Sequence, residues 1–135
     1  MPEFYTLRDA NEKLPELTRL LHLMQAQGQQ LAELRGRAAD VKKKVSSNGD
    51  HNPSEDILLT QAEKGLEDAL DVTVEKLQDW NILLKDLERG LVDFPSLREG
   101  RTVFLCWELG ESEVAHWHET TTGYDDRRPV DEWTA

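Results

Sequence analysis

Two long heptad patterns constrain the fold of this chain more than any other feature of its sequence. Apolar residues alternate at spacings of three and four from Leu17 to Val45, with Gln27 as the one polar member. A second run of the same alternation extends from Leu59 to Leu91. Such spacing places one apolar stripe along each of two helices, and two stripes of this kind bury best against each other. The sequence therefore predicts a long antiparallel helical hairpin, similar to a coiled coil.

Capping and helix-breaking residues set the expected helix boundaries. Thr6 is a typical N-cap, and Pro15 suits the first turn of a helix better than its interior. Gly90 is a natural helix stop, because glycine adopts a left-handed conformation without steric cost. Between the two heptad runs, SSNGDHNP concentrates turn formers. The expected elements are a short N-terminal helix at 7–13, a long helix at 15–45, a loop at 46–53 and a second long helix at 54–89.

The residue pattern changes after Gly90. The segments RTVFLCWEL and SEVAHWH are rich in β-branched and aromatic residues, and Gly110 lies between them. This composition predicts a β-hairpin over 101–118, followed by an irregular polar tail at 119–135. The predicted fold class is mainly α (α+β): a helical hairpin with an appended C-terminal β-hairpin, in a single domain of residues 1–135.

The charge of the chain excludes several classes of partner. There are 16 Lys and Arg residues against 27 Asp and Glu residues, which gives a net charge of −11. A chain so acidic is not expected to bind nucleic acid or an anionic membrane, because such binding depends on neutralising phosphates. No apolar run approaches the ~20 residues that span a bilayer, and the first residues show no signal-peptide pattern. With Cys106 as the single cysteine, we expect a cytoplasmic protein.

The distribution of charge favours pairing of the two predicted helical arms. Residues 1–45 hold 8 basic and 6 acidic side chains, whereas residues 46–90 hold 4 basic and 11 acidic ones. A basic arm against an acidic arm disfavours contacts between like arms. Each arm also carries apolar residues outside its heptad stripe, such as Leu23, Leu58 and Val72. A two-fold homodimer would cover them.

Three blocks of sequence, taken together, resemble a known protein family. They are FYTLRDANEKLP at the start, LLKDLERGLVDFPSLREGR in the middle, and VFLCWELGESEVAHWHE with GYDDRRP at the end. The family is the one catalogued as domain of unknown function 2203, and the resemblance covers nearly the whole chain. It implies a bacterial cytosolic protein of helical-hairpin type and brings no established activity. The matching motif positions are Lys85, Asp86, Arg89, Gly90, Asp93, Phe94, Pro95, Trp107, Trp117, His118, Glu119, Gly123, Arg127 and Pro129.

A first candidate site is a transition-metal site on the predicted β-hairpin. His116 and His118 are two residues apart, which places both imidazoles on one face of a strand. Cys106 offers a third ligand if the strand register allows it. A two-residue turn pairs His116 with Leu105, whereas a three-residue turn places Cys106 directly opposite His116. The alternative is that both histidines are ordinary strand residues and Cys106 is a small buried apolar one.

A second candidate is a pocket for a small anion, formed by His118, Glu119, Tyr124 and Arg127. A histidine, a carboxylate and an arginine near aromatic rings can bind an anion or exchange a proton. Alternatively, Arg127 pairs with a carboxylate and this segment is a structural strap.

The two heptad patterns indicate function more strongly than these candidate sites do. We expect a non-enzymatic cytosolic protein that self-associates and acts through protein contacts, with no cofactor. The chain shows no pattern typical of an activated serine or cysteine nucleophile. The alternative is a protein that binds a metal or a small anion, or an enzyme, with a site at the β-hairpin and the tail. That site would use His116, His118 and Glu119 with Arg127, and its metal would be a divalent transition-metal ion.

Overall fold

The structure is a computed structural model that describes residues 3–48 and 53–131, so residues 49–52 of the predicted loop lie outside it. The chain forms two compact units, Met1–His22 with Glu75–Ala135 and Leu23–Val74. Neither of the described helices is long and apolar enough to span a membrane. The elements are α1 (Leu7–Asn48), α2 (Pro53–Asp79), β1 (Leu83–Asp86), β2 (Leu91–Arg98), β3 (Arg101–Glu108), β4 (His116–Glu119), a 3-10 turn (Tyr124–Asp126) and β5 (Arg128–Pro129).

The first helix is continuous, so the predicted division into a helix at 7–13 and another from Pro15 is wrong. Thr6 caps α1 as expected, because its hydroxyl accepts a backbone hydrogen bond of 3.0 Å from the first turn. Pro15 lies inside the helix with its ring exposed. It removes one helical hydrogen bond, but Leu14 and Leu17 on either side are buried. Their burial outweighs the cost of the proline.

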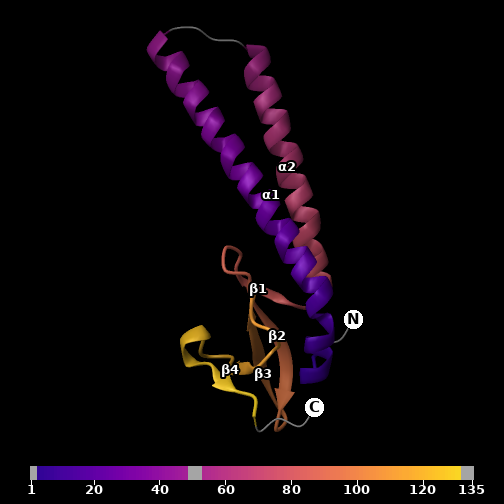
Figure 1. The fold of residues 1–135 in the computed structure, drawn as a ribbon. Coiled ribbons are helices and arrows are strands. Elements are labelled where there is room, and N and C mark those ends of the chain that lie inside the picture. The colour runs from indigo at the N-terminus through magenta and orange to yellow at the C-terminus, as the bar shows by residue number, and fades with distance from the viewer. Residues whose placement is uncertain (1–2, 49–52, 132–135) are drawn as a thin grey trace. The chain divides into compact units, whose positions relative to one another are not determined.

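Within the unit Leu23–Val74, α1 and α2 run antiparallel to each other (Figure 1). Gln27 donates a hydrogen bond of 3.4 Å from Nε2 to the carbonyl of Ala69. Arg35 reaches two carboxylates of α2: its Nε lies 2.8 Å from Glu63, and its Nη2 pairs with Glu67. These ion pairs join a basic stretch of the first helix to an acidic stretch of the second.

The predicted fold class is wrong because the second half of the chain forms a five-stranded antiparallel sheet, not an appended β-hairpin. The strand order β1-β2-β3-β4-β5 follows the chain order (Figure 1). The sheet takes in residues that were expected to form the end of the helix at 54–89 and part of the tail at 119–135. The two helices and the sheet together make the fold α+β.

The second helix ends at Asp79 because the chain turns left-handed two residues later. Asn81 has a φ of 57°, a conformation that asparagine tolerates better than most residues. The leucines beyond it keep the heptad spacing, yet Leu84 and Leu91 lie in the strands β1 and β2 and pair with Val92 and Glu108, respectively. Short apolar-rich segments fit both a helix and a strand pattern. Here, pairing with neighbouring strands makes them strands.

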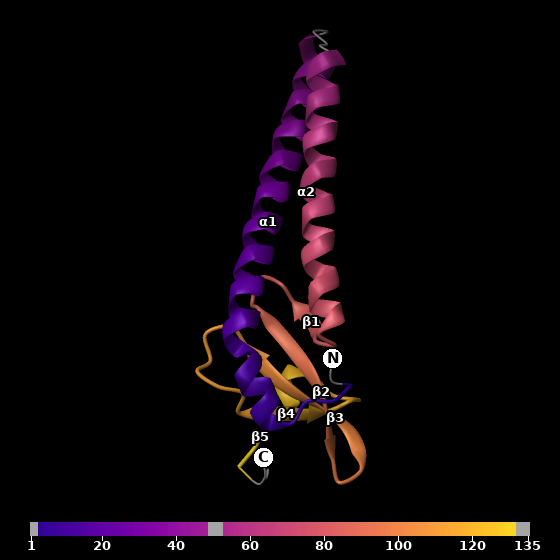
Figure 2. The ribbon, with the colours of Figure 1, turned by 90° about the vertical axis from the view of Figure 1, so that its right-hand side faces the viewer.

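One face of the sheet packs against the first turns of α1 (Figure 2). Phe94, Leu105 and Trp117 form a cross-strand row on this face, and all three are buried. The ring of Tyr5 packs edge-on against Phe94 at a centroid distance of 5.1 Å. The Tyr5 hydroxyl donates a hydrogen bond to the carbonyl of Trp80. These residues form the apolar core between the sheet and the first turns of α1.

Candidate metal centre

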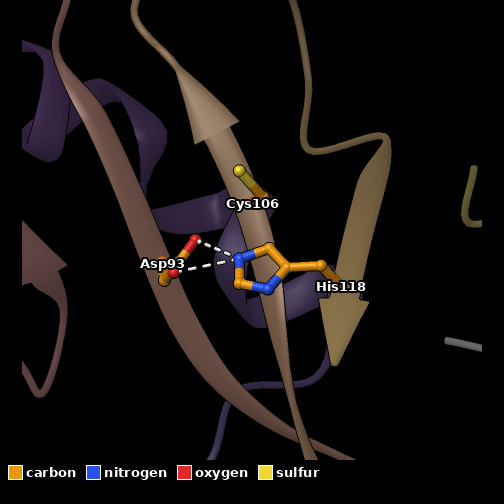
Figure 3. A group of neighbouring side chains, drawn as sticks. All are labelled: Asp93, Cys106 and His118. Atoms are coloured by element: carbon orange, nitrogen blue, oxygen red, sulfur yellow. Dashed lines mark hydrogen bonds and ion pairs between the residues drawn. The ribbon is translucent and has the colours of Figure 1, made fainter. Parts of the chain in front are cut away.

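The opposite face of the sheet brings three ligand-type side chains together. Asp93 of β2 pairs with Cys106 of β3, which pairs in turn with His116 of β4. Cross-strand partners share a face of the sheet, as do residues two apart along a strand, so His118 lies on this face too. Asp93, Cys106 and His118 are only 2%, 1% and 3% exposed. Figure 3 shows His118 reaching from β4 across β3 toward Asp93, with Cys106 beside them.

Both ring nitrogens of His118 face hydrogen-bond acceptors. Nδ1 lies 2.7 Å from the backbone carbonyl of Glu119, to which it donates. Nε2 lies 3.0 Å from each carboxylate oxygen of Asp93. One proton must lie between Nε2 and the carboxylate, because two bare acceptors would repel each other. The bond from Nδ1 to a carbonyl is the arrangement that orients metal-binding histidines, with Nε2 as the ligand atom.

Cys106 is held as a neutral thiol. Burial, and then the neighbouring charge of Asp93, raise the pKa of the Cys106 thiol to about 12, although the guanidinium of Arg127 acts in the opposite direction. A thiol with so high a pKa is a poor nucleophile at neutral pH, because only the thiolate attacks. A metal ion would change this, since a coordinated thiol loses its proton.

The three ligand atoms are close enough to hold one metal ion. The sulfur of Cys106, a ring nitrogen of His118 and a carboxylate oxygen of Asp93 all lie within 4.8 Å of one another. A tetrahedral zinc ion with bonds of about 2.0–2.3 Å holds its ligand atoms about 3.3–3.8 Å apart. The ligand atoms therefore have to approach one another by up to about 1 Å to hold such an ion.

His116 lies beside this cluster but points to another partner. It stands directly opposite Cys106, the register expected for a three-residue turn, although residues 109–115 connect the strands. Its buried Nδ1 has no hydrogen-bond partner among the described residues and lies 3.7 Å from a carboxylate oxygen of Glu111. Of the predicted metal set, the structure brings Cys106 and His118 together and directs His116 toward Glu111.

The residues of the predicted anion pocket are distributed over separate contacts. The Glu119 carboxylate pairs with Arg101, at 2.6 Å, and not with the His118 ring. The Tyr124 ring packs under Arg127, whose Cζ lies 4.0 Å from the ring centroid. Arg127 also pairs with Glu111 at 3.0 Å. The structure therefore keeps Tyr124 and Arg127 together but separates them from Glu119.

Asp93 is the member of the cluster that sequence reasoning missed. In the sequence, Asp93 was noted only as a motif position of the family. A signal was present, because Asp93 is a lone acid in the apolar run LVDFP. An acid inside a strand that is buried on both faces needs a partner, since an unpaired buried charge is very costly. Recognising 91–98 as a strand would have placed Asp93 opposite a neighbouring strand.

Comparison with known proteins gives a family but no activity. Residues 3–130 match the model of a family described as an uncharacterized conserved protein, DUF2203, which confirms the family expected from the sequence motifs. No curated protein and no solved structure matches the chain. The matched region contains Asp93, Cys106 and His118. Because the family description names no activity, the geometry of these residues is the remaining guide to function.

Proposed function

Because the chain belongs to this family of uncharacterized proteins, whose description names no activity, we propose a function from geometry: the protein binds one divalent transition-metal ion through Asp93, Cys106 and His118. One observation carries the proposal, namely that a carboxylate, a thiol and an imidazole converge within 4.8 Å in the buried part of the sheet. The ion would tie β2, β3 and β4 together.

Zinc fits this ligand set better than other common ions. Thiolate, imidazole and carboxylate are all zinc ligands, whereas magnesium and calcium prefer oxygen alone. Charge balance supports the same ion. One thiolate and one carboxylate neutralise a divalent cation, so the loaded cluster carries no net charge into a buried position.

The role we propose for the ion is structural and not catalytic. The three side chains are 1–3% exposed, which keeps a substrate away from the ion. Three protein ligands and one water molecule are more typical of catalytic zinc than of structural zinc, so the structural role rests on the burial of the ligands. A thiolate ligand has to stay reduced, so we place the protein in the cytoplasm.

Metal analysis of protein purified without a histidine tag tests the proposal. We expect one zinc ion per chain, and we expect Asp93→Asn and His118→Ala to lose it after dialysis against a weak chelator. His22→Ala is the matched control, because His22 is exposed on α1 outside the cluster. Wild-type protein without stoichiometric zinc, and without a thermal shift on adding zinc, would overturn the proposal.

A spectroscopic measurement on the wild-type chain avoids variants that fail to fold. Cobalt bound in place of zinc should show a thiolate-to-metal charge-transfer band. Cys106 is the single cysteine of the chain, so this band would report on that residue alone. Cobalt bound with no such band would place the ion elsewhere and contradict the assignment.

A separate observation favours self-association as a second role. Within Leu23–Val74, α2 carries an exposed apolar stripe, whose ends, Leu58 and Val72, are each 66% exposed. Small exposed residues lie between them at helical spacing: Ala62, Gly65 and Ala69. Beside the stripe is a groove of about 460 Å³ lined by residues of both helices. Small residues allow another helix to approach closely.

Charge complementarity supports a second copy of this chain as the occupant. The stretch 54–74 of α2 contains six acidic residues and one basic one, Lys64. The stretch 23–48 of α1 contains five basic residues and two acidic ones. In a two-fold dimer, α1 of each copy lies on the stripe of the other, so opposite charges meet on both sides.

Sedimentation equilibrium at micromolar concentration tests the dimer. Val72→Glu places a charge on the stripe and should give monomers. Thr60→Glu adds the same charge at an exposed position of α2 away from the stripe and should leave the dimer intact. Monomeric wild-type protein, or equal association of the two variants, would show that the stripe is not an interface.

A further inference from the structure

Three arginines gather around one buried tryptophan at the end of the sheet where β2 turns into β3. The guanidinium carbons of Arg98, Arg101 and Arg128 lie 4.8, 6.0 and 5.5 Å from the ring centroid of Trp117. Trp117 itself is 4% exposed. Cations over an indole ring are attracted by its electron-rich face. The ring thus serves as a platform that orients guanidinium groups.

Carboxylates accompany these arginines: Glu99 and Asp131 line the same pocket, and Glu119 lies beside it. Arg101 is paired, at 2.6 Å with Glu119 and at 3.3 Å with Glu99. Arg128 forms no hydrogen bond or ion pair with any residue that the structure describes. The three arginines act on one carboxylate together: Arg101 lowers the pKa of Glu119 most, and Arg128 and Arg98 lower it further.

The arginines line an open pocket with a volume of about 370 Å³. Its wall also includes Pro129 and Asp131 of the β5 region. The pocket is large enough for a small ion with bound water. Trp117 also lines the pocket but is only 4% exposed, so its ring offers little surface on which a nucleobase could stack.

We propose that this pocket, which we call the arginine pocket, binds a phosphate-type oxyanion, either free phosphate or the end group of a small phosphate monoester. Guanidinium groups match phosphate oxygens in a planar, two-pronged way. Stacking on Trp117 holds the forks in place before binding, which reduces the entropy lost on association. The arginine pocket is independent of the proposed metal centre, because Trp117 lies on the opposite face of the sheet from His118.

Isothermal titration with inorganic phosphate, methyl phosphate and acetate, at one ionic strength, tests the arginine pocket. Both phosphates should bind and acetate should not. Arg128→Gln should weaken phosphate binding on the order of tenfold, the effect of losing one charged hydrogen bond. Arg19→Gln is the control, because it removes the same charge from an exposed position of α1.

Arg128 is the residue of choice for the test because it is exposed and holds no ion pair with the described residues, so the variant should fold. A thermal unfolding midpoint equal to that of the wild type would verify this, and Arg98→Gln provides a second variant. Tighter binding of methyl phosphate than of phosphate would identify a monoester as the ligand, and the reverse would identify free phosphate. Phosphate heats equal to those of acetate, or equal phosphate affinity in Arg128→Gln and the wild type, would overturn the proposal.

Discussion

Gly90 occupies a position where both the backbone and the space exclude other residues. Its φ is +66°, and a Cβ atom there would lie 2.5 Å from the Cβ of Leu109. Gly100 in the turn between β2 and β3 has a φ of +79° but open space around it. The two glycines therefore share the conformational constraint and differ in the steric one.

Alanine substitutions at the two glycines should separate these effects. We expect Gly100→Ala to lower the free energy of unfolding by about 1–2 kcal/mol, the cost of a left-handed alanine. Gly90→Ala should lose about 1–3 kcal/mol more, because Leu109 has to move. Urea unfolding of both variants measures the difference. Equal losses would mean that β3 shifts freely to accept the new methyl group.

The thiol of Cys106 should make stability depend on pH in the alkaline range. Its pKa is about 12 in the folded chain against 9.0 for an ordinary thiol. Between these values the unfolded chain binds fewer protons than the folded one, so the free energy of unfolding falls as pH rises. Below pH 9 this contribution is fully present. This prediction holds for the metal-free protein, so the measurement includes a chelator.

Urea unfolding across this pH range, in the wild type and in Cys106→Ala, isolates the thiol. The pKa of Tyr5 is also raised, mainly by burial, and acts in the same direction. Because Tyr5 is present in both proteins, the difference between the two slopes belongs to Cys106. Parallel slopes would show that the thiol is already accessible to water in the folded chain.

Residue type alone indicated part of the candidate metal centre. Cys106 and His118 were suspected because thiols and imidazoles are metal ligands, whatever their environment. His116 was included because it is two residues from His118, a spacing that fixes the face of a strand but not the partner. Asp93 required knowledge of a third strand. The strands at 91–98 and 101–108 are joined by a turn of two residues, so their pairing is local. The strand at 91–98 was missed because its first six residues are all buried, and such a strand shows no alternation of polar and apolar residues.

Among the elements, α1 contains the clearest conflict between local preference and tertiary packing. Pro15 interrupts the helix locally, yet the buried leucines around it keep α1 continuous. Pro15→Ala restores a backbone N–H and removes the ring from the helix interior. We expect the free energy of unfolding to rise by about 1–2 kcal/mol, since the gain in helix propensity exceeds the entropy that alanine returns to the unfolded chain.

Arg19→Ala is the control for this substitution. Arg19 is another exposed position of α1, and replacing arginine with alanine changes helix propensity little. Chemical unfolding of the two variants gives the comparison. A loss of stability in Pro15→Ala would contradict this expectation. It would mean that contacts of the proline ring stabilise the folded chain by more than the missing backbone hydrogen bond costs.

Helices were easier to predict than strands for a physical reason. The heptad runs from Leu17 and from Leu59 show a helix period over many residues. The first run is helical to its end, and the second is helical as far as Asp79. Strands β1 and β5 have four and two residues, too few to show alternation. Each is stable only because it pairs with a neighbour, β2 or β4. The five-stranded sheet is therefore a product of pairing, not of local preference.

Across the whole molecule, buried side chains are distributed unevenly between the two units. In Leu23–Val74 the buried residues among those described are Met24, Leu31 and Thr73. The unit that contains the sheet buries most of the core, including Phe94 and Leu105. Because stability against local opening follows buried apolar area, the amides of Leu23–Val74 should exchange with solvent faster than those of the central strands.

Hydrogen exchange measured with and without zinc tests both the difference between the two units and the proposed metal centre. An ion bound by β2, β3 and β4 is lost when the sheet opens, so zinc should slow exchange in these strands. At a free zinc concentration of ~1,000 times its Kd, the expected stabilisation is about 4 kcal/mol, or roughly a thousandfold in rate. The amides at 54–74 should keep their rates, because Leu23–Val74 contains none of the three ligands. Asp93→Asn should abolish the zinc effect. Equal slowing of both units would mean that they open together, and no slowing in the strands would mean that zinc binds elsewhere.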